Sequence, residues 1–178
     1  LEQRSRDEVL LQFVNGSANV LVATNLAARG LDIPALPLVI ITEISPDPEV
    51  HLHRIGRTAR AGSAGLALSL VAPREQERLA RVEALLGHAI PHGTDPPPAQ
   101  HTTMPAPAYR TLLLLAGRRD KLRKADILGT LIKAGSLPPD VIGRIDLQQA
   151  ICAVAVRRSH AEQALQCVRG GRIKKKRV

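Results

Sequence analysis

Aromatic side chains are almost absent from this 178-residue sequence: Phe13 and Tyr109 are the only two, and tryptophan does not occur. A hydrophobic core must therefore be built from Leu, Val, Ile and Ala, and an apolar content of 44% is enough for a globular chain. The same shortage leaves any surface that would stack nucleic-acid bases nearly bare.

Cysteine is scarce as well. Cys152 and Cys167 lack CxxC spacing and ordered histidine companions, which argues against a zinc site and a disulfide scaffold, so no metal ligands are predicted. The sequence has no signal-like segment and no apolar run long enough to span a bilayer, so we expect no membrane contact and a cytoplasmic location. Because the chain opens on Leu1, we expect further residues to precede it.

The formal charge of +9 is unevenly distributed along the chain. Residues 1–107 carry 9 Lys and Arg against 11 Asp and Glu, which gives −2, whereas residues 108–178 carry 16 against 5, which gives +11. This division predicts two modules, of which the second binds a polyanion through its phosphates. A solvated basic tail is the alternative, because the last residues include Lys174, Lys175, Lys176 and Arg177.

Residues 1–88 are predicted to form an α/β domain with a parallel, doubly wound sheet. Short apolar runs at 20–23, 38–41 and 66–71 predict strands buried on both faces. Asp47 before Pro48 predicts a helix that carries residues 53–60, and a second helix from Arg74 is predicted to end before Gly87.

The remaining sequence predicts a linker and a second domain. Six prolines between residues 89 and 108 exclude regular structure there. Beyond it, strands are predicted at 111–116, 142–147, 151–156 and 172–178, and helices at 124–134 and 160–168. The order βαββαβ is typical of α+β ferredoxin-like folds, which include RNA-recognition motifs (RRMs), so residues 109–178 are predicted to be an RRM-like domain.

Two stretches of the first domain carry chemistry. In "HRIGRTARAG", residues 53–62, a helix would project His53, Arg57 and Arg60 from one face, where two guanidiniums could grip a terminal phosphate. In "VLVATNLAARGLDI", residues 20–33, Thr24 would end a parallel strand at the edge where open α/β sheets bind ligands. An exposed basic helix and an ordinary strand-turn are the alternatives.

The two stretches, in this order, resemble motifs V and VI of the DEAD-box RNA helicases, whose second RecA-like domain reads ATD-x-AARGLD and HRIGRTGR. Gln3-Arg4-Ser5-Arg6 also matches the QxxR element of that family. The RTARAG variant, followed by an RRM-like domain, resembles the DbpA type of bacterial helicase, whose terminal domain docks on large-subunit ribosomal RNA.

The resemblance implies roles for single residues. Arg57 and Arg60 would contact the γ-phosphate of ATP, with Arg57 as the arginine finger, while Gly30 and Asp32 would face the nucleotide and its ribose. The RNA backbone would be contacted by Thr24, Gln3 and Arg6, and the two sites would be coupled through His53 and the position of Asn25. Asn25 replaces the aspartate usual in the family, so coupling could be weakened unless the amide hydrogen-bonds well enough; Ala59 replaces the usual glycine.

The sequence contains neither a GxxxxGK[ST] loop nor an Asp-Glu-Ala-Asp element. ATP with Mg²⁺ would therefore be held mainly by an N-terminal RecA-like domain outside this sequence, and the chain alone is not expected to hydrolyse ATP. RNA would be bound in the second domain through phosphate contacts, guanidinium stacking and RNA shape. The candidates there are Arg118, Arg119, Lys121, Arg123, Lys124, Arg172, Lys174, Lys175, Lys176 and Arg177.

We therefore hypothesise that the chain is the C-terminal part of an ATP-dependent RNA helicase that unwinds short duplexes in ribosome assembly and binds a large-subunit ribosomal RNA hairpin. A non-catalytic RNA-binding module or degenerate helicase, marked by Asn25, is the alternative of another class. A relative that remodels other nucleoprotein complexes is a third.

Overall fold

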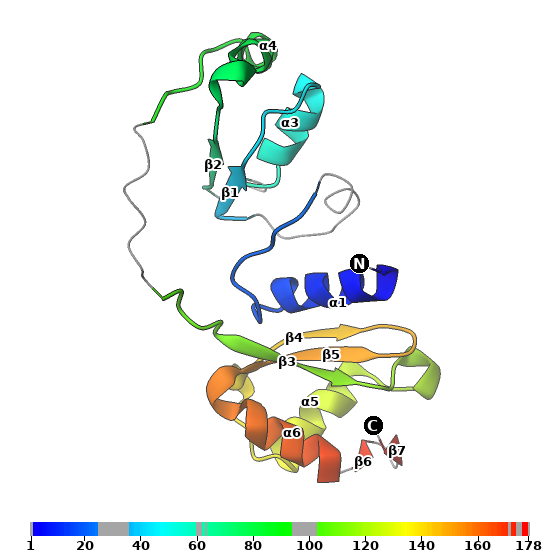
Figure 1. Cartoon of the computed structure of the whole chain (residues 1–178). Helices are drawn as coiled ribbons and strands as arrows, with labels where there is room; N and C mark the ends of the chain where they lie inside the picture. The colour runs from blue at the N-terminus through cyan, green and yellow to red at the C-terminus, as the bar shows by residue number, and fades with distance from the viewer. Residues whose placement is uncertain are drawn as a thin grey trace. The chain divides into compact units, whose positions relative to one another are not determined.

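The computed structural model of the chain describes residues 2–24, 36–59, 62, 64–93, 103–170, 172–173 and 176–177. The chain divides into two compact units, one formed by Leu1–Ala23 together with Thr103–Val178 and the other by Thr24–Thr102. The predicted domain limits differ from this division, because residues 1–23 cluster with the C-terminal unit. Figure 1 shows the elements of each unit.

The Thr24–Thr102 unit contains two parallel strands, β1 (Leu38–Ile41) and β2 (Leu66–Ser69), paired in register from Leu38 opposite Leu66. The connection between them carries α3 (Pro48–Ile55), and β2 is followed by η1 (Pro73–Glu75) and α4 (Gln76–Leu86). Asp47 caps α3 by accepting a hydrogen bond from the Glu49 backbone N–H at 2.9 Å. Gly87, at φ 76°, ends α4 in the left-handed conformation that favours glycine. These predicted boundaries are confirmed.

Three predictions for this half of the chain are wrong. The strands at 38–41 and 66–69 are not buried on both faces, since Ile40 is 57% and Leu66 53% exposed. Residues 20–23 form no strand, and Val22 is 93% exposed, because within the described residues no neighbouring strand offers them backbone partners. The helix expected to carry residues 53–60 ends at Ile55. Thr58 instead pairs with Leu36 as an isolated parallel bridge, and this long-range contact draws the chain out of the helical path.

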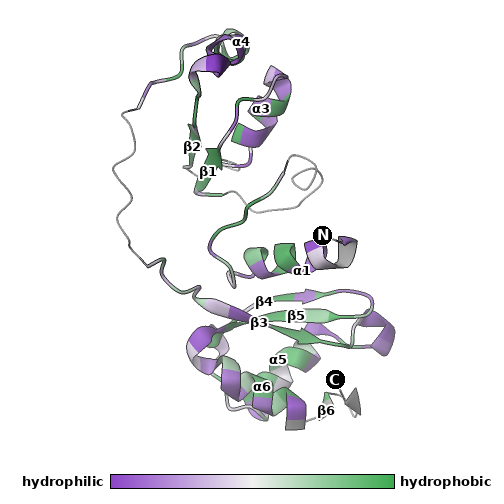
Figure 2. Ribbon diagram, in the orientation of Figure 1, coloured by the Kyte–Doolittle hydropathy of each residue, from purple (hydrophilic) through white to green (hydrophobic). Residues whose placement is uncertain are grey.

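The C-terminal unit contains an antiparallel sheet of β3 (Tyr109–Leu114), β4 (Ile142–Leu147) and β5 (Cys152–Arg157), in the order β3-β5-β4. Helices α5 (Lys124–Lys133) and α6 (Ala161–Gly170) cover one face (Figure 1). Alternate residues of β5 enter the core, where Val154 and Val156 are buried with Ile127 and Leu131. Figure 2 shows apolar segments on the sheet and on parts of α5 and α6. The predicted α/β and α+β fold classes and the order of these five elements are confirmed.

The predicted last strand, at 172–178, is wrong. Arg172–Ile173 (β6) and Lys176–Arg177 (β7) form a short antiparallel pair with each other, and these four residues do not pair with the three-stranded sheet. A strand of the sheet needs alternating apolar residues for its core face, and this segment reads Arg-Ile-Lys-Lys-Lys-Arg. Ile173 alone joins the core cluster from the described part of the segment.

The other face of the sheet lies beside α1 (Gln3–Val14), as Figure 1 shows. The residues after α1 are tied to β3: Asn15 Nδ2 donates to Thr111 Oγ1 at 3.3 Å, and the Tyr109 N–H donates to the Gly16 carbonyl at 3.3 Å. Since β3 begins at Tyr109 and not at the predicted Thr111, the sheet includes one aromatic side chain that the sequence analysis left out.

Candidate nucleotide and nucleic-acid interfaces

Helix α3 carries the first three residues of the motif "HRIGRTARAG" and contacts the parallel sheet through His51, which precedes the motif. His51 is buried, and its Nε2 lies 3.2 Å from Ser69 Oγ on β2. Arg54 Nη1 donates to the carbonyl oxygen of Glu43 at 2.9 Å. These two contacts, with the Asp47 cap, fix the helix before the chain reaches Arg57.

Arg57 lies in a turn and not on the helix. Its N–H donates to the Arg54 carbonyl at 3.1 Å, a spacing of three residues that tightens the end of α3. The side chain is half-buried, and no carboxylate of the described residues forms an ion pair with it. His53 is exposed in the last turn of α3, so the prediction that His53 and Arg57 share one helix face is wrong.

The backbone after Arg57 is unusual. Ala59 has φ 54°, in the left-handed region that side chains with a Cβ disfavour. This is the position where the helicase motif quoted above has glycine. The resemblance and the backbone geometry therefore agree that a glycine-like conformation is needed here.

Two buried ionisable groups support this unit. Burial, together with the nearby charge of Arg54, lowers the pKa of His51, and within the described part of the chain its Nδ1 has no hydrogen-bond partner. The Glu75 carboxylate accepts from the N–H of Ala72 at 2.9 Å and of Ile44 at 3.1 Å. Chiefly the hydrogen bond from Ala72 lowers the pKa of Glu75, so this carboxylate joins the start of α4 to the end of β1 in its charged form.

The C-terminal unit presents a cationic loop, residues 117–124, which follows β3 and ends on Lys124, the first residue of α5. Its backbone is docked on the β4–β5 turn: the Arg118 N–H donates to Gln148 O at 2.9 Å and the Arg119 N–H to Gln149 O at 3.0 Å. Leu122 is buried beneath it. The loop holds five exposed cations in place, namely Arg118, Arg119, Lys121, Arg123 and Lys124.

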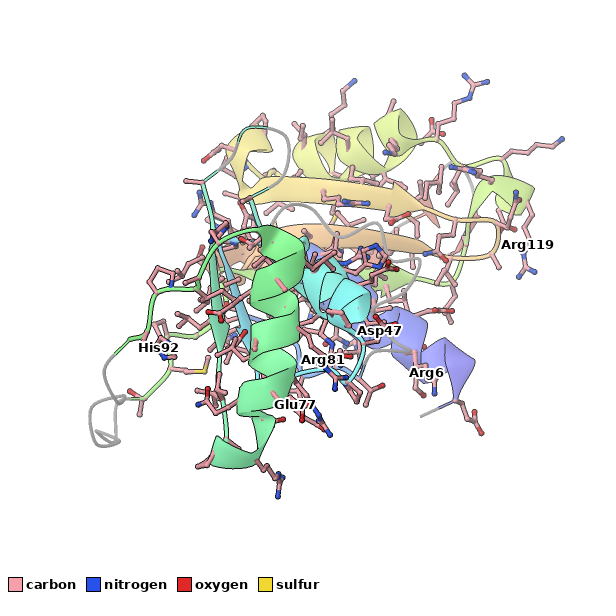
Figure 3. The ribbon with its side chains drawn as sticks, turned by 90° about the horizontal axis from the view of Figure 1, so that it is seen from above. Arg6, Asp47, Glu77, Arg81, His92 and Arg119 are labelled. Atoms are coloured by element: carbon pink, nitrogen blue, oxygen red, sulfur yellow. The ribbon has the colours of Figure 1, made fainter. Side chains whose placement is uncertain are left out.

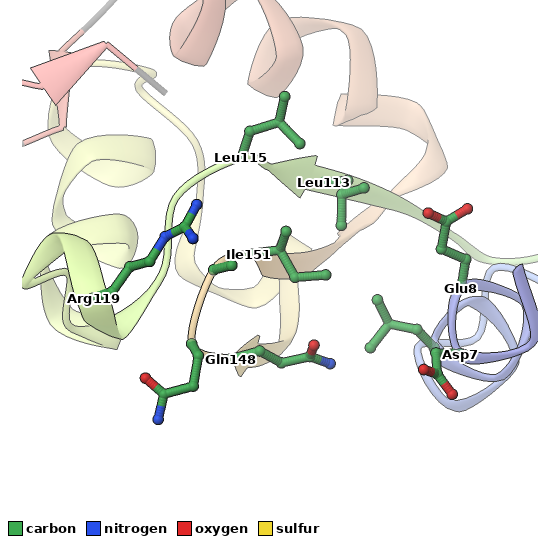
Figure 4. Close-up of a pocket in the computed structure, with 10 residues that line it drawn as sticks. Asp7, Glu8, Leu113, Leu115, Arg119, Gln148 and Ile151 are labelled. Atoms are coloured by element: carbon green, nitrogen blue, oxygen red, sulfur yellow. The ribbon is translucent and has the colours of Figure 1, made fainter. Parts of the chain in front are cut away.

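A pocket of about 680 Å³ adjoins the cationic loop (Figure 4). Apolar lining comes from Leu113, Leu115 and Ile151, and polar lining from Arg119 and Gln148. Residues of α1, including Asp7 and Glu8, close one side of it. The pocket therefore combines an apolar floor with a cation, amides and two carboxylates that can hydrogen-bond to a polar ligand.

The sequence analysis missed four residues at this end of the chain. The Arg157 guanidinium lies 5.7 Å from the centroid of the Tyr109 ring. Tyr109 could have been found, because it is the one aromatic residue of this half and lies two residues before the predicted strand. Gln148 and Gln149 act through their backbone carbonyls, which no residue type signals.

The comparisons with known proteins match both halves. The helicase conserved C-terminal domain matches residues 1–62, and the DbpA RNA binding domain matches residues 111–178. ATP-dependent RNA helicase DbpA of Escherichia coli strain K12 is 46% identical over 176 residues, which are 99% of this chain and 38% of that protein. Over almost its whole length, the chain is therefore similar to the C-terminal part of this DbpA helicase.

Other relatives match the first half. ATP-dependent rRNA helicase RRP3 of Yarrowia lipolytica is 48% identical over 90 residues, which are 51% of this chain and 19% of that protein. In a crystal structure, the E. coli DEAD-box protein SrmB bound to regulator of ribonuclease activity A is 39% identical, with a TM-score of 0.45 over 51% of this chain and 53% of that one. The chain thus spans 38% of DbpA and 19% of RRP3.

Several of the predicted site residues lie outside the described residues. They are Asn25, Gly30, Asp32, Arg60, Lys174 and Lys175, and the side chains of Gln3, Arg172, Lys176 and Arg177 are likewise not described. Thr24 is exposed in an irregular segment, so its predicted position at the end of a strand is wrong. Arg6 and Arg119 are exposed and are labelled in Figure 3. All the proposed roles of these residues remain predictions.

Among the described residues, no group of three or more His, Cys, Asp or Glu side chains could hold a metal ion. None of the helices in the described ranges has the length and hydrophobicity that crossing a bilayer requires.

Proposed function

We propose that the protein containing this chain is an ATP-dependent RNA helicase that acts on large-subunit ribosomal RNA during ribosome assembly in the cytoplasm. The Thr24–Thr102 unit would complete the ATP site, and the C-terminal unit would bind the RNA. Two features of the same chain support this most directly. Arg57 lies in a helicase motif and forms no ion pair with a carboxylate of the described residues. The C-terminal unit presents a cationic loop whose backbone is hydrogen-bonded to the β4–β5 turn.

The residues present fit a nucleotide phosphate better than a metal ion. The half-buried guanidinium of Arg57 can grip phosphate oxygens and stabilise the charge that develops in phosphoryl transfer. Arg60 would add a second guanidinium, and Gly30 and Asp32 would face the nucleotide and its ribose. Mg²⁺ would be held mainly by an N-terminal RecA-like domain, where the family carries its triphosphate-binding loop.

On the RNA side, we propose that the cationic loop binds the phosphates of a ribosomal RNA hairpin. Five cations held on one short loop favour a compact, charged target over an extended strand that needs a row of stacking aromatics. Gln3, Arg6 and Thr24 would contact the RNA bound in the helicase core, with His53 and Asn25 coupling it to ATP. Arg172 and the lysines at 174–176 would extend the charged surface of the second domain. We retain 1–88, 89–108 and 109–178 as the domain limits of this proposal.

The RNA side can be tested with the chain itself. Arg118→Gln with Arg119→Gln removes two cations but keeps the backbone hydrogen bonds to the β4–β5 turn. Affinity for a ribosomal RNA hairpin should fall by about tenfold or more, and the slope of log K against log salt should decrease by about 1.5 to 2. Arg74→Gln with Arg81→Gln is the matched control, because these exposed arginines belong to the other unit. An equal loss in both double variants would contradict the assignment.

The helicase activity is tested in the full-length gene product. ATP turnover should rise when the hairpin is added, and deletion of residues 108–178 should leave basal turnover intact while removing selectivity for that RNA. RNA binding without any ATP turnover would instead identify a non-catalytic RNA-binding module.

A further inference from the structure

We propose that Thr58 is a positioning residue for Arg57, holding the backbone of this arginine against Leu36 so that the guanidinium meets the transferred phosphate in one place. The inference rests on the proposed function of Arg57. Thr58 would act only through its neighbour and would touch neither ATP nor RNA.

Both polar groups of the Leu36 backbone are engaged by this one turn. The Leu36 N–H donates to the Arg57 carbonyl oxygen at 3.1 Å, and the Thr58 hydroxyl donates to the Leu36 carbonyl oxygen. Leu36 and Thr58 also form the isolated parallel bridge. The peptide between Arg57 and Thr58 is therefore held from two sides by a single residue.

The space around the Thr58 hydroxyl is closed. Thr58 is 5% exposed, and a Cβ built on Gly65 would overlap Thr58 Oγ1 and lie 2.7 Å from the Ala59 nitrogen. The hydroxyl is thus enclosed by the Gly65 backbone on one side and by Leu36 on the other. In this enclosed position the Thr58 side chain adopts the rotamer that makes the hydrogen bond to Leu36.

Leu36 connects this turn to the sheet. Pro37 follows it, and the Pro37 carbonyl accepts from the Leu66 N–H at 2.9 Å at the start of the β1–β2 pair. On its other side Arg57 is held by α3, which is fixed through His51 and Arg54. The backbone of Arg57 is therefore held by α3 on its N-terminal side and by the hydrogen bonds to Leu36 on its C-terminal side. The Thr58 hydroxyl makes one of these bonds to Leu36.

Anchoring of this kind matters for phosphoryl transfer, because catalysis there consists almost entirely of positioning and electrostatic stabilisation. A misplacement of about 1 Å can cost about 100-fold in rate. A hydroxyl that fixes one peptide unit beside the arginine finger is thus expected to influence turnover more than substrate binding.

The test uses three variants of the full-length gene product. Thr58→Val removes the hydroxyl and keeps the shape, Thr58→Ser keeps the hydroxyl, and Arg57→Ala removes the finger. For Thr58→Val, kcat of RNA-stimulated ATP hydrolysis should fall by about tenfold or more, while KM for ATP and the RNA Kd stay within about twofold. Thr58→Ser should restore kcat to within about threefold of the wild type. Amide exchange at Leu36 should accelerate in Thr58→Val and not in Thr58→Ser.

The outcomes separate the two levels of the proposal. Normal turnover in Arg57→Ala would overturn the proposed function itself. Loss of turnover in Arg57→Ala with normal turnover in Thr58→Val would overturn only the role of Thr58, as would an equal loss in Thr58→Val and Thr58→Ser. The amide of Leu70, which donates to Ile41 O at 2.8 Å, reports whether the sheet is intact. Should Thr58→Val not fold, Thr58→Cys takes its place with the same expected result.

Discussion

Glycine at position 59 is expected to stabilise the protein, although replacing alanine by glycine usually does the opposite. Ala59 has φ 54°, and the left-handed conformation costs a residue with a Cβ about 1–2 kcal/mol. Glycine escapes this cost but loses about 0.5–1 kcal/mol more conformational entropy on folding than alanine does. The difference predicts that Ala59→Gly stabilises the Thr24–Thr102 unit by about 0.5–1 kcal/mol.

Ala80→Gly is the matched control, since Ala80 is exposed within α4 of the same unit. There the identical chemical change should destabilise the unit by about 1 kcal/mol, because helical backbone already suits alanine. The two variants should therefore differ by about 1.5–2 kcal/mol with opposite signs.

Amide exchange of Leu66 and Leu70 measures this effect in the intact chain, because their hydrogen bonds to Pro37 and Ile41 hold the β1–β2 pair. Exchange should slow by a factor of about 2 to 5 in Ala59→Gly and quicken by about fivefold in Ala80→Gly. If both variants quicken exchange alike, Ala59 carries no backbone strain and the reasoning fails.

Three further predictions follow from single contacts. Gly117→Ala would set a methyl 2.5 Å from Gln149 O, so the cationic loop would have to move, and binding titrations should show affinity for the RNA hairpin weakened by about tenfold or more. Gly129→Ala is the control, because its methyl meets open space and should leave the affinity unchanged. Burial lowers the pKa of His51, so the unfolded chain takes up the proton at higher pH than the folded chain does. The urea midpoint of the Thr24–Thr102 unit should therefore fall as the pH drops below 6.5, and this fall should be smaller in His51→Gln. Burial raises the pKa of Cys152 to about 11, so iodoacetamide at pH 8 should label this thiol in denaturant and leave it unlabelled in the folded chain; equal labelling would contradict its burial.

Local signals in the sequence predicted the element boundaries that depend on short-range chemistry. Asp47 before Pro48 begins α3, Gly87 ends α4, and the apolar run at 152–156 forms the central strand β5. For the two helix ends the deciding contact lies within a few residues, as with the Asp47 carboxylate and the Glu49 N–H. Strand β5 also depends on its pairing with β3, which lies far away in the sequence.

The failures depend on contacts between distant residues. Helical periodicity extends past Ile55, but the chain leaves the helix because Thr58 pairs with Leu36, 22 residues away. The segment at 20–23 is apolar enough for a strand, yet an apolar run alone does not supply a neighbouring strand. In the described part of 172–178, Arg172–Ile173 pairs with Lys176–Arg177 and not with the sheet, because Ile173 is the one apolar residue among these four.

For the candidate sites, too, the sequence indicated the residue types, and the contacts that hold them are known only from the structure. The five cations of the loop at 117–124 could be read from the sequence, and the structure adds what holds them: carbonyl oxygens of the β4–β5 turn, which are independent of residue type. The resemblance to helicases singled out Arg57 by its motif. It did not indicate that Thr58, Leu36 and Gly65 enclose the adjoining peptide, because that arrangement exists only after folding.

The central claim, that Arg57 acts on the phosphate of ATP, is tested most directly by RNA-stimulated ATP turnover in the full-length gene product. Arg81→Ala is the control, an exposed arginine of α4 that pairs with Glu77 at 2.5 Å (Figure 3). The account predicts that Arg57→Ala lowers kcat by about 1,000-fold with the RNA Kd nearly unchanged, and that Arg81→Ala changes neither. Turnover in Arg57→Ala equal to that in Arg81→Ala would contradict it.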